Sequence, residues 1–277
     1  MTREPPQFTA VILAARRAGR LDPLAAEAGV THKCLVPLVG RPLIQYVLEA
    51  LAAVPGLEKI RISVEPEAIE KVREVRGAKG ELGVPVEFVA SGETITDSTY
   101  LAGRDVEGPL LFTTADNVNL TPEAVLRVMA PLTRGADGAI GVAEREAVLA
   151  ARGQKPGTPG TERVGPYRFR DGSFSNCNLY AMTGPEVLRG AEVFREGGQF
   201  SKKKRRLVKL AGLFNLVLFV MRVLTLQQAM KRLSRRLGLR VTAVELPDGA
   251  QAVDVDNPGA YRAAERIIRQ RALPAPC

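Results

Sequence analysis

The chain has 277 residues, of which 45% are hydrophobic and 25% are charged, so it is a globular protein and not a disordered or fibrous one. Its net charge of +9 resembles that of a nucleic-acid-binding protein, but twelve of its 39 basic residues lie within 199–244, which contains no Asp or Glu. The other 27 basic residues (39 less 12) face 30 acidic ones, so the body of the chain is mildly acidic and we expect no specific nucleic-acid partner.

Cysteine usage and the N-terminus bear on the compartment. Cys34, Cys177 and Cys277 share no close spacing, which predicts reduced thiols and disfavours a disulfide framework or a zinc site. The first residues show no basic-then-apolar secretion signal. We therefore expect a cytoplasmic protein.

The first half of the chain alternates apolar strands with helices. A buried strand is predicted at 8–14, and it ends in the small and basic residues of the loop 15–20. Further strands and helices follow at regular spacing. The strands are expected at 59–64, 84–90, 109–114 and 139–143. The helices are expected at 42–53 and 67–75, with a short one that ends at about 103 and another that begins at Pro122. This order predicts an α/β fold with an open, mostly parallel, doubly wound sheet.

The second half departs from this alternation. The Gly- and Pro-rich stretch 152–161 predicts a loop or lid, and 167–170 and 175–182 predict short antiparallel strands. The predicted closing elements are strands at 240–246 and 252–255 and a helix at 257–271. We expect one domain spanning 1–277, with a loop and hairpin region at 152–198 and a basic amphipathic helical insertion at 199–238.

Polar residues gather where the predicted parallel strands end. The loop 15–20 follows the first strand, the loop 91–98 follows the third, and Asp116 follows the fourth. Ligands of such sheets bind beyond the carboxyl ends of the strands. The sequence therefore predicts a binding site at this edge, with small and basic residues suited to phosphate groups.

Several motifs carry a resemblance to a known family: Val11-Ile-Leu-Ala14, Arg20, His32 to Leu43, Thr113-Thr-Ala-Asp116, and Val253 to Pro258. The most specific is Lys-x-Leu-x-x-x-x-Gly-x-Pro at 33–42. With these motifs the chain resembles the MobA-like NTP transferases, within the wider sugar-phosphate and alcohol-phosphate nucleotidyltransferases. The resemblance implies a Rossmann-like nucleotidyltransferase fold and the transfer of a nucleoside monophosphate from an NTP to a phosphorylated acceptor, with release of pyrophosphate.

The resemblance also implies roles for individual residues. Arg20, Lys33 and Asp116 are expected to act in catalysis, because the reaction needs phosphate charge neutralised and the acceptor aligned. Asn178 is the expected acceptor contact, and it lies in the region 152–198 that we expect on the acceptor side of the site. Mg²⁺ is the implied cofactor, held by Asp116 and Asp256, with Asp254 as a substitute on the same face of the closing strand. The implied nucleotide-binding residues are Leu13, Ala14, Ala15, Arg16, Gly19, Arg20, Lys33 and Ser98, with Arg17 as a further phosphate contact.

Alternatives remain open at this point. Ala15 and Arg16 stand where the family usually has glycines, which favours a second reading as a catalytically degenerate, membrane-associated scaffold. A third is a GT-A-like glycosyltransferase that uses Asp254 and Asp256 as a metal pair. Asp116 could be a simple turn residue and Asp256 a helix N-cap. His32 is expected to be structural.

The basic segment has two readings of its own. Its apolar stretch 207–226 is interrupted by Lys209, Asn215 and Arg222, which disfavours a membrane-spanning helix. Residues 200–236 either lie on an anionic membrane, making the protein peripheral on the inner face, or pack on the core with their basic face in water.

Overall fold

The computed structural model describes residues 6–16, 21–158, 161–162, 164–190 and 223–272. The predictions for Arg17, Gly19 and Arg20, those for 191–198 of the loop and hairpin region, and those for 199–222 of the basic segment lie outside these residues. Within the described part the fold is α/β, as predicted.

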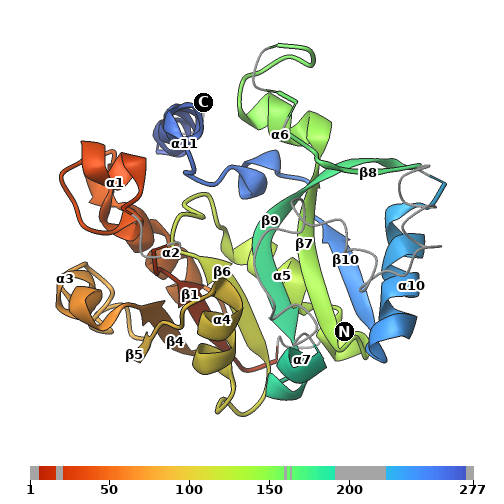
Figure 1. Ribbon diagram of the computed structural model, residues 1–277, viewed down its shortest axis with the longest axis horizontal. Coiled ribbons are helices and arrows are strands. Elements are labelled where there is room, and N and C mark those ends of the chain that lie inside the picture. Colours follow the sequence, from red (N-terminus) through yellow and green to blue (C-terminus); the bar gives the residue numbers. More distant parts are fainter. Residues whose placement is uncertain (1–5, 17–20, 159–160, 163, 191–222, 273–277) are drawn as a thin grey trace.

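One mixed sheet runs through the molecule in the strand order β5-β4-β1-β6-β9-β7-β10, with β8 added on β9 (Figure 1). All of its neighbours pair in parallel except β9, which runs antiparallel to β6, β7 and β8. Its strands are β1 (Phe8–Leu13), β4 (Leu57–Val64), β5 (Val86–Ala90), β6 (Leu110–Thr114), β7 (Gly138–Glu144), β8 (Tyr167–Phe169), β9 (Gly172–Met182) and β10 (Val241–Glu245). A separate two-stranded sheet joins β2 (Pro37–Leu38) to β3 (Arg41–Pro42).

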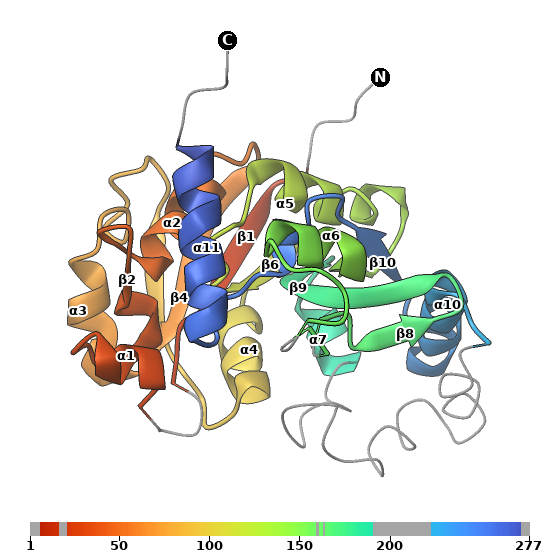
Figure 2. The same cartoon turned by 90° about the horizontal axis from the view of Figure 1, so that it is seen from above.

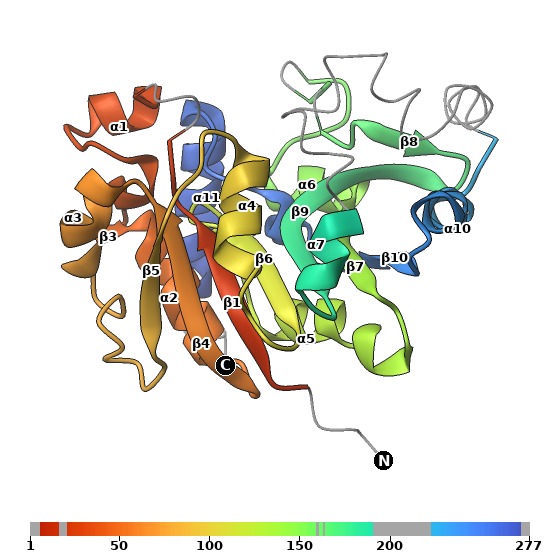
Figure 3. The same cartoon turned by 60° about the horizontal axis from the view of Figure 1, so that its bottom comes forward.

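Helices cover both faces of this sheet. Figure 3 shows α4 (Ile95–Gly103) and α7 (Pro185–Gly190) in front of the strands, where their apolar side chains share a cluster with Val11 and Phe112. Side chains from the opposite face pack in the main core. The helices that contribute there are α2 (Leu43–Ala52), α3 (Ile69–Arg73), α5 (Pro122–Met129), α6 (Arg145–Ala151) and α11 (Pro258–Arg271). The short α1 (Pro23–Glu27) packs with α2 and α11.

Local sequence explains why these elements begin and end where they do. Strand β1 consists of apolar and β-branched residues that are buried on both faces, as a central parallel strand requires. Thr121 caps α5 and Pro122 occupies its first turn, as predicted. The basic helix α10 (Leu226–Leu237) starts at a capping box formed by Thr225 and Gln228, and ends at Gly238 with φ 66°.

Two parts of the fold differ from the sequence prediction. Helix α6 was not expected, and its backbone packs directly on the 3-10 turn Gly249–Ala252. Residues 252–255 were predicted to be a strand, but the described backbone at 253–256 forms none, because Asp248 caps that turn and diverts the chain. The hairpin of β8 and β9 was predicted, whereas the insertion of β9 between β6 and β7 was not.

The described end of the basic segment packs on the core. Leu226 and Met230 of α10 contact an apolar cluster on β7, β9 and β10, while Lys231 and Arg235 are exposed. In the part of the chain that the structure describes, no helix is long and apolar enough to cross a membrane. Cys34 and Cys177 are buried free thiols.

Candidate active site

The site starts where β1 and β6 end together. The two strands are in parallel register, with Leu13 opposite Thr114, and the amide of Ala115 donates to the carbonyl of Leu13 at 3.0 Å. Since both strands end at the same level, the loop after β1 and Asp116 after β6 emerge side by side at the carboxyl edge of the sheet. This arrangement was predicted.

Lys33 lies at the centre of this edge. It opens the 3-10 turn Lys33–Leu35, and its ammonium donates to Asp116 Oδ2 and, at 2.7 Å, to Asp256 Oδ1. The structure thus brings together three residues that were all predicted for the site. Lys33 and Asp116 are 83 residues apart in sequence, and Asp256 follows 140 residues after Asp116. Lys33 and Asp116 are only 20% and 12% exposed, so their ion pair is shielded from water more than a surface pair is.

The charged groups of this site change one another's pKa values. Burial opposes the charged form of Lys33, but the carboxylates of Asp116 and Asp256 outweigh it and raise the pKa of the ammonium. Burial likewise opposes the charge on Asp116, and the ammonium of Lys33 lowers the pKa of that carboxyl nevertheless. Burial, reinforced by Asp116 and Asp256, raises the pKa of Asp254 well above its usual range.

The segment before α11 supplies Asp254 and Asp256, but not from a strand as predicted. The amide of Val255 donates to the carbonyl of Asp116 at 3.3 Å, which fixes the segment against the end of β6. Asp256 is not the N-cap of α11, because the side chain of Asn257 accepts from the amide of Ala260. The carboxylate of Asp256 is therefore available to Lys33.

Asn178 enters the site from a bulge in β9. The register of β7 and β9 shifts between Ile140 and Val142, and Asn178 lies among the extra residues of β9. It adopts φ 47°, which Asn tolerates better than most side chains. Its side-chain amide donates to Asp254 Oδ2 at 2.6 Å, so the bulge turns the predicted acceptor contact toward the carboxylates.

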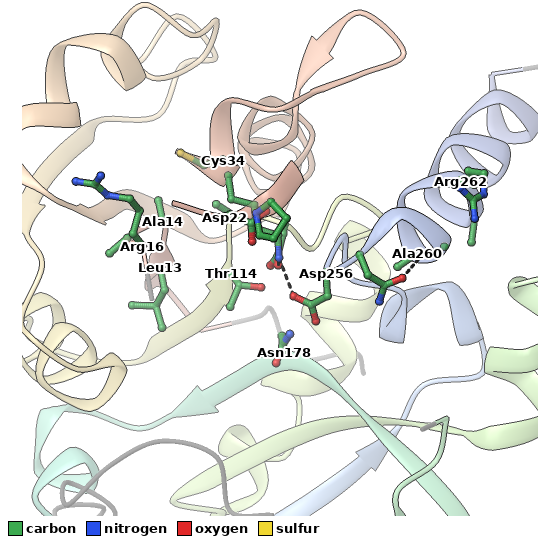
Figure 4. A pocket seen from close by; sticks show the side chains of 18 of the residues that line it. Leu13, Ala14, Arg16, Asp22, Cys34, Thr114, Asn178, Asp256, Ala260 and Arg262 are labelled. Atoms are coloured by element: carbon green, nitrogen blue, oxygen red, sulfur yellow. Dashed lines mark hydrogen bonds and ion pairs between the residues drawn. The ribbon is translucent and has the colours of Figure 1, made fainter. Parts of the chain in front are cut away.

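Arg16, at the start of the altered loop, is turned toward acidic residues after β4. Its backbone amide donates to Glu65 Oε1 at 2.8 Å, and its guanidinium donates to Glu67 Oε1 at 2.8 Å. Glu65 Oε2 also lies 3.2 Å from Nε2 of the buried His32. Figure 4 shows the Arg16 side chain pointing away from Asp256 and Asn178. The sequence did not single out Glu65, although its place directly after a predicted strand was a usable signal.

Ser98 does not reach the site. It is buried, its hydroxyl donates to the carbonyl of Thr94 at 3.0 Å, and it accepts from the amide of Gly92 at 3.0 Å. It therefore joins the loop after β5 to the first turn of α4. Ile95, from the exposed side of the same helix, lines the cavity instead.

An open cavity of about 1460 Å³ contains these groups. Figure 4 shows Leu13, Ala14 and Arg16 at one end, and Asn178 and Asp256 in the middle. Lys33 and Asp116 belong to the middle as well, because the Lys33 ammonium contacts both Asp116 and Asp256. The far end is formed by α11 and the residues after α6, which Figure 2 shows on one face of the sheet. Arg152, Arg262 and Arg266 line that end, and sequence reasoning missed all three.

The carboxylates at the end of β6 and before α11 resemble a magnesium site in their chemistry. Among the described residues no three His, Cys, Asp or Glu side chains form a ready-made metal site. Mg²⁺, however, is commonly held by one or two carboxylates together with water and substrate phosphate. Asp254 Oδ1 is buried without a hydrogen-bond partner. Asp116, Asp254 and Asp256 place three carboxyl groups around the single ammonium of Lys33. These residues fit a hard divalent cation.

Comparisons with known proteins agree with this architecture. The model of the MobA-like NTP transferase domain matches residues 10–240. A 2-C-methyl-D-erythritol 4-phosphate cytidylyltransferase from Gloeobacter violaceus is 37% identical over 83 residues, which are 30% of this chain and 34% of that protein. The chain thus matches about a third of that relative's length.

Solved structures extend the similarity to the whole fold. A hypothetical transferase from Thermus thermophilus is 27% identical, with a TM-score of 0.69 over 92% of this chain and 99% of that one. A 4-diphosphocytidyl-2C-methyl-D-erythritol synthase from Anaerococcus prevotii has a TM-score of 0.59 over 96% and 97% of the two chains. At 11% identity, this second structure shares the fold alone.

Proposed function

The chain belongs to the MobA-like NTP transferase family, and from that premise we propose that it transfers a nucleoside monophosphate from an NTP to a phosphorylated acceptor. An oxygen of the acceptor phosphate attacks the α-phosphorus of the NTP. The bond between the α-phosphorus and the oxygen that bridges it to the β-phosphorus breaks, and pyrophosphate leaves with the electron pair of that bond. The acceptor is a sugar, inositol or other alcohol phosphate. CTP is the first nucleotide to test, because the locally similar relative is a cytidylyltransferase.

One observation carries the proposal: Lys33 meets Asp116 and Asp256 in a large cavity at the carboxyl edge of the sheet. Nucleotidyl transfer asks little covalent chemistry of a protein and depends on charge neutralisation and in-line placement. In this proposal the Lys33 ammonium leaves its carboxylate partners for the phosphate oxygens that gain charge in the transition state. Arg20, outside the described residues, neutralises the leaving pyrophosphate.

Mg²⁺ is part of the proposal. Asp116 and Asp256 would hold it, with Asp254 beside them, and when bound it would supply positive charge against the phosphate oxygens. The chain's own contribution is to hold these carboxylates at the end of β6 and before α11. The hydrogen bond from Val255 to the Asp116 carbonyl links the two segments.

Arg16, the last described residue of the altered loop, is compatible with nucleotide binding in this proposal. Arg16 replaces a glycine of the family pattern, but its guanidinium points at Glu67 and its amide at Glu65. The side chain therefore extends away from Asp256 and Asn178 (Figure 4). This geometry favours an active transferase over a degenerate one.

A pyrophosphate-release assay tests the proposal. CTP, ATP, GTP and UTP are each incubated with Mg²⁺ and a panel of sugar, inositol and alcohol phosphates. We expect release with one pairing, falling to background in Asp116→Asn. Glu70→Gln, which changes an 81% exposed carboxylate on α3, serves as the matched control and is expected to keep full activity.

The other outcomes separate the alternatives. Failure of every NTP to bind in the presence of Mg²⁺ would overturn the proposal. Binding without turnover by any acceptor would favour a degenerate scaffold. Consumption of a sugar nucleotide, in place of its release, would identify a glycosyltransferase.

We also propose that the basic segment 200–236 contacts an anionic membrane surface. Its described end, α10, contains no acidic residue, and its apolar side is already packed on β10, so the contact would be electrostatic. Sedimentation with phosphatidylglycerol vesicles, weakened by salt and absent with phosphatidylcholine, is the expected result. Equal recovery with both lipids would contradict a charge-driven contact.

A further inference from the structure

Three arginines form the far end of the cavity. Arg152 follows the last residue of α6, and Arg262 and Arg266 are four residues apart on α11, so they project from the same side of that helix. The two helices are joined here, because Arg266 Nη2 donates to the carbonyl of Ala151 at 3.4 Å. We call this set of three residues the arginine end.

None of these three guanidinium groups forms an ion pair within the described residues. The contrast on the same helix is direct, since Arg269 pairs with Glu265 at 2.9 Å and Arg271 pairs with Asp248 at 2.5 Å. Arg152 Nε is buried without a hydrogen-bond partner. A buried donor left unsatisfied is costly, so in an open cavity it is available to a water molecule or, in its place, to a ligand atom.

Burial also acts on the charge of Arg152. It lowers the pKa of the guanidinium, against the attraction of Asp254 and Asp256, which lie within electrostatic range but make no contact with it. Glu162 lines the same cavity and has an interaction of its own. The positive charge of the arginine end is thus only partly compensated by its surroundings.

The arginine end lies on the acceptor side of the site. Figure 4 shows Arg16, beside the loop expected to bind the NTP, at one end of the cavity and Arg262 at the other, with Asp256 and Asn178 between them. An NTP with its phosphates near Lys33 and the β1 loop leaves this far end to the second substrate.

We propose that the arginine end binds a second anionic group of the acceptor, a carboxylate or a phosphate, distinct from the phosphate that attacks the NTP. The inference rests on the proposed function and narrows it: the acceptor is a small compound with at least two separate anionic groups, and not a monophosphate whose remainder is neutral. Guanidinium groups suit this task because their planar array of donors matches carboxylate and phosphate oxygens in pairs.

Two matched pairs of acceptors test the proposal by titration calorimetry in the presence of CTP and Mg²⁺. 3-Phosphoglycerate has a carboxylate where glycerol 3-phosphate has a hydroxymethyl group, and fructose 1,6-bisphosphate differs from fructose 6-phosphate by one added phosphate. We expect the more anionic member of at least one pair to bind about tenfold more tightly or better. The pair that discriminates identifies the group that is bound.

Variants connect the preference to the arginines. Arg152→Gln and the exposed Arg262→Gln are each expected to remove the preference and to leave CTP binding unchanged. Arg134→Gln is the control, because that exposed arginine precedes β7 at the opposite edge of the sheet. Arg262→Gln keeps the test valid if Arg152→Gln fails to fold.

The outcomes are separable. If CTP binds but neither pair discriminates, or if the preference survives in both arginine variants, the anion-binding inference is overturned and the proposed function stands. If no NTP binds to the wild-type protein, the proposed function falls and this inference falls with it.

Discussion

Glu65 is predicted to hold the altered loop in a shape that can accept a nucleotide. The change to test is Glu65→Ala, which removes the acceptor of the Arg16 amide at 2.8 Å and the group 3.2 Å from His32 Nε2. A hydrogen bond to a charged group contributes roughly 1.5–3 kcal/mol, and a half-buried donor left unpaired adds to the loss. We therefore expect the free energy of unfolding to fall by about 2–4 kcal/mol.

The same change should weaken CTP binding. Without Glu65 the backbone at Arg16 loses its fixed position beside the end of β1, and the loop must be ordered by the ligand. An ordering cost of about 1–2 kcal/mol corresponds to a roughly 5- to 30-fold higher dissociation constant. Urea unfolding measures the first effect, and a calorimetric CTP titration measures the second.

Glu67→Ala is the matched control, because Glu67 also contacts Arg16 but is 62% exposed, against 17% for Glu65. An exposed ion pair contributes about 0–1 kcal/mol, so this variant should remain close to the wild type in both measurements. Equal destabilisation in the two variants, or unchanged CTP affinity in Glu65→Ala, would refute the assigned role of Glu65.

Three further outcomes are expected. Burial lowers the pKa of His32 below its usual 6.5, so the unfolded state binds more protons than the folded state. The free energy of unfolding should therefore fall as pH drops below about 6.5, and His32→Gln should flatten that slope in urea unfolding between pH 5 and 7. A Cβ on Gly249 would lie 2.1 Å from the Ala147 backbone, so Gly249→Ala should lower the free energy of unfolding by about 1–3 kcal/mol or more. Gly138→Ala is the control, because the nearest atom to its Cβ is 3.5 Å away; equal melting temperatures of the two variants would contradict this prediction. Asn178→Gly keeps the φ of 47° but removes the side chain, so turnover should fall while melting changes little, and a large loss of stability would instead indicate a packing role.

Residues inside local patterns could be predicted from the sequence. The strands at 8–14 and 109–114, the cap at Thr121 and the Lys33 motif are short-range features, and both the fold and the family were predicted correctly. The convergence of Lys33 with Asp116 followed from a general rule, that parallel strands present their carboxyl ends at one edge.

Long-range pairings could not be predicted in the same way. An alternating strand pattern says which face of β9 is buried, but not that β9 lies between β6 and β7, so the bulge that orients Asn178 was not expected. Arg152 was correctly placed at the start of a loop, but α6 before it was missed, and the contact between Arg266 and the Ala151 carbonyl depends on two helices that are distant in sequence. The roles of these residues in catalysis and binding remain predictions.

The position of β9 has a consequence for how the chain acquires its structure. Strands β6 and β7 are both made before β9, yet neither pairs with the other, so a growing chain that has reached α6 holds two open strand edges facing a gap. Such edges can pair with other chains until they are filled. Synthesis must proceed through residue 182 before the gap closes, and the cavity becomes complete only when α11 arrives. Fragments that stop after β7 and before residue 182 should therefore aggregate. The ability to bind substrate should be among the last properties that the newly made protein gains.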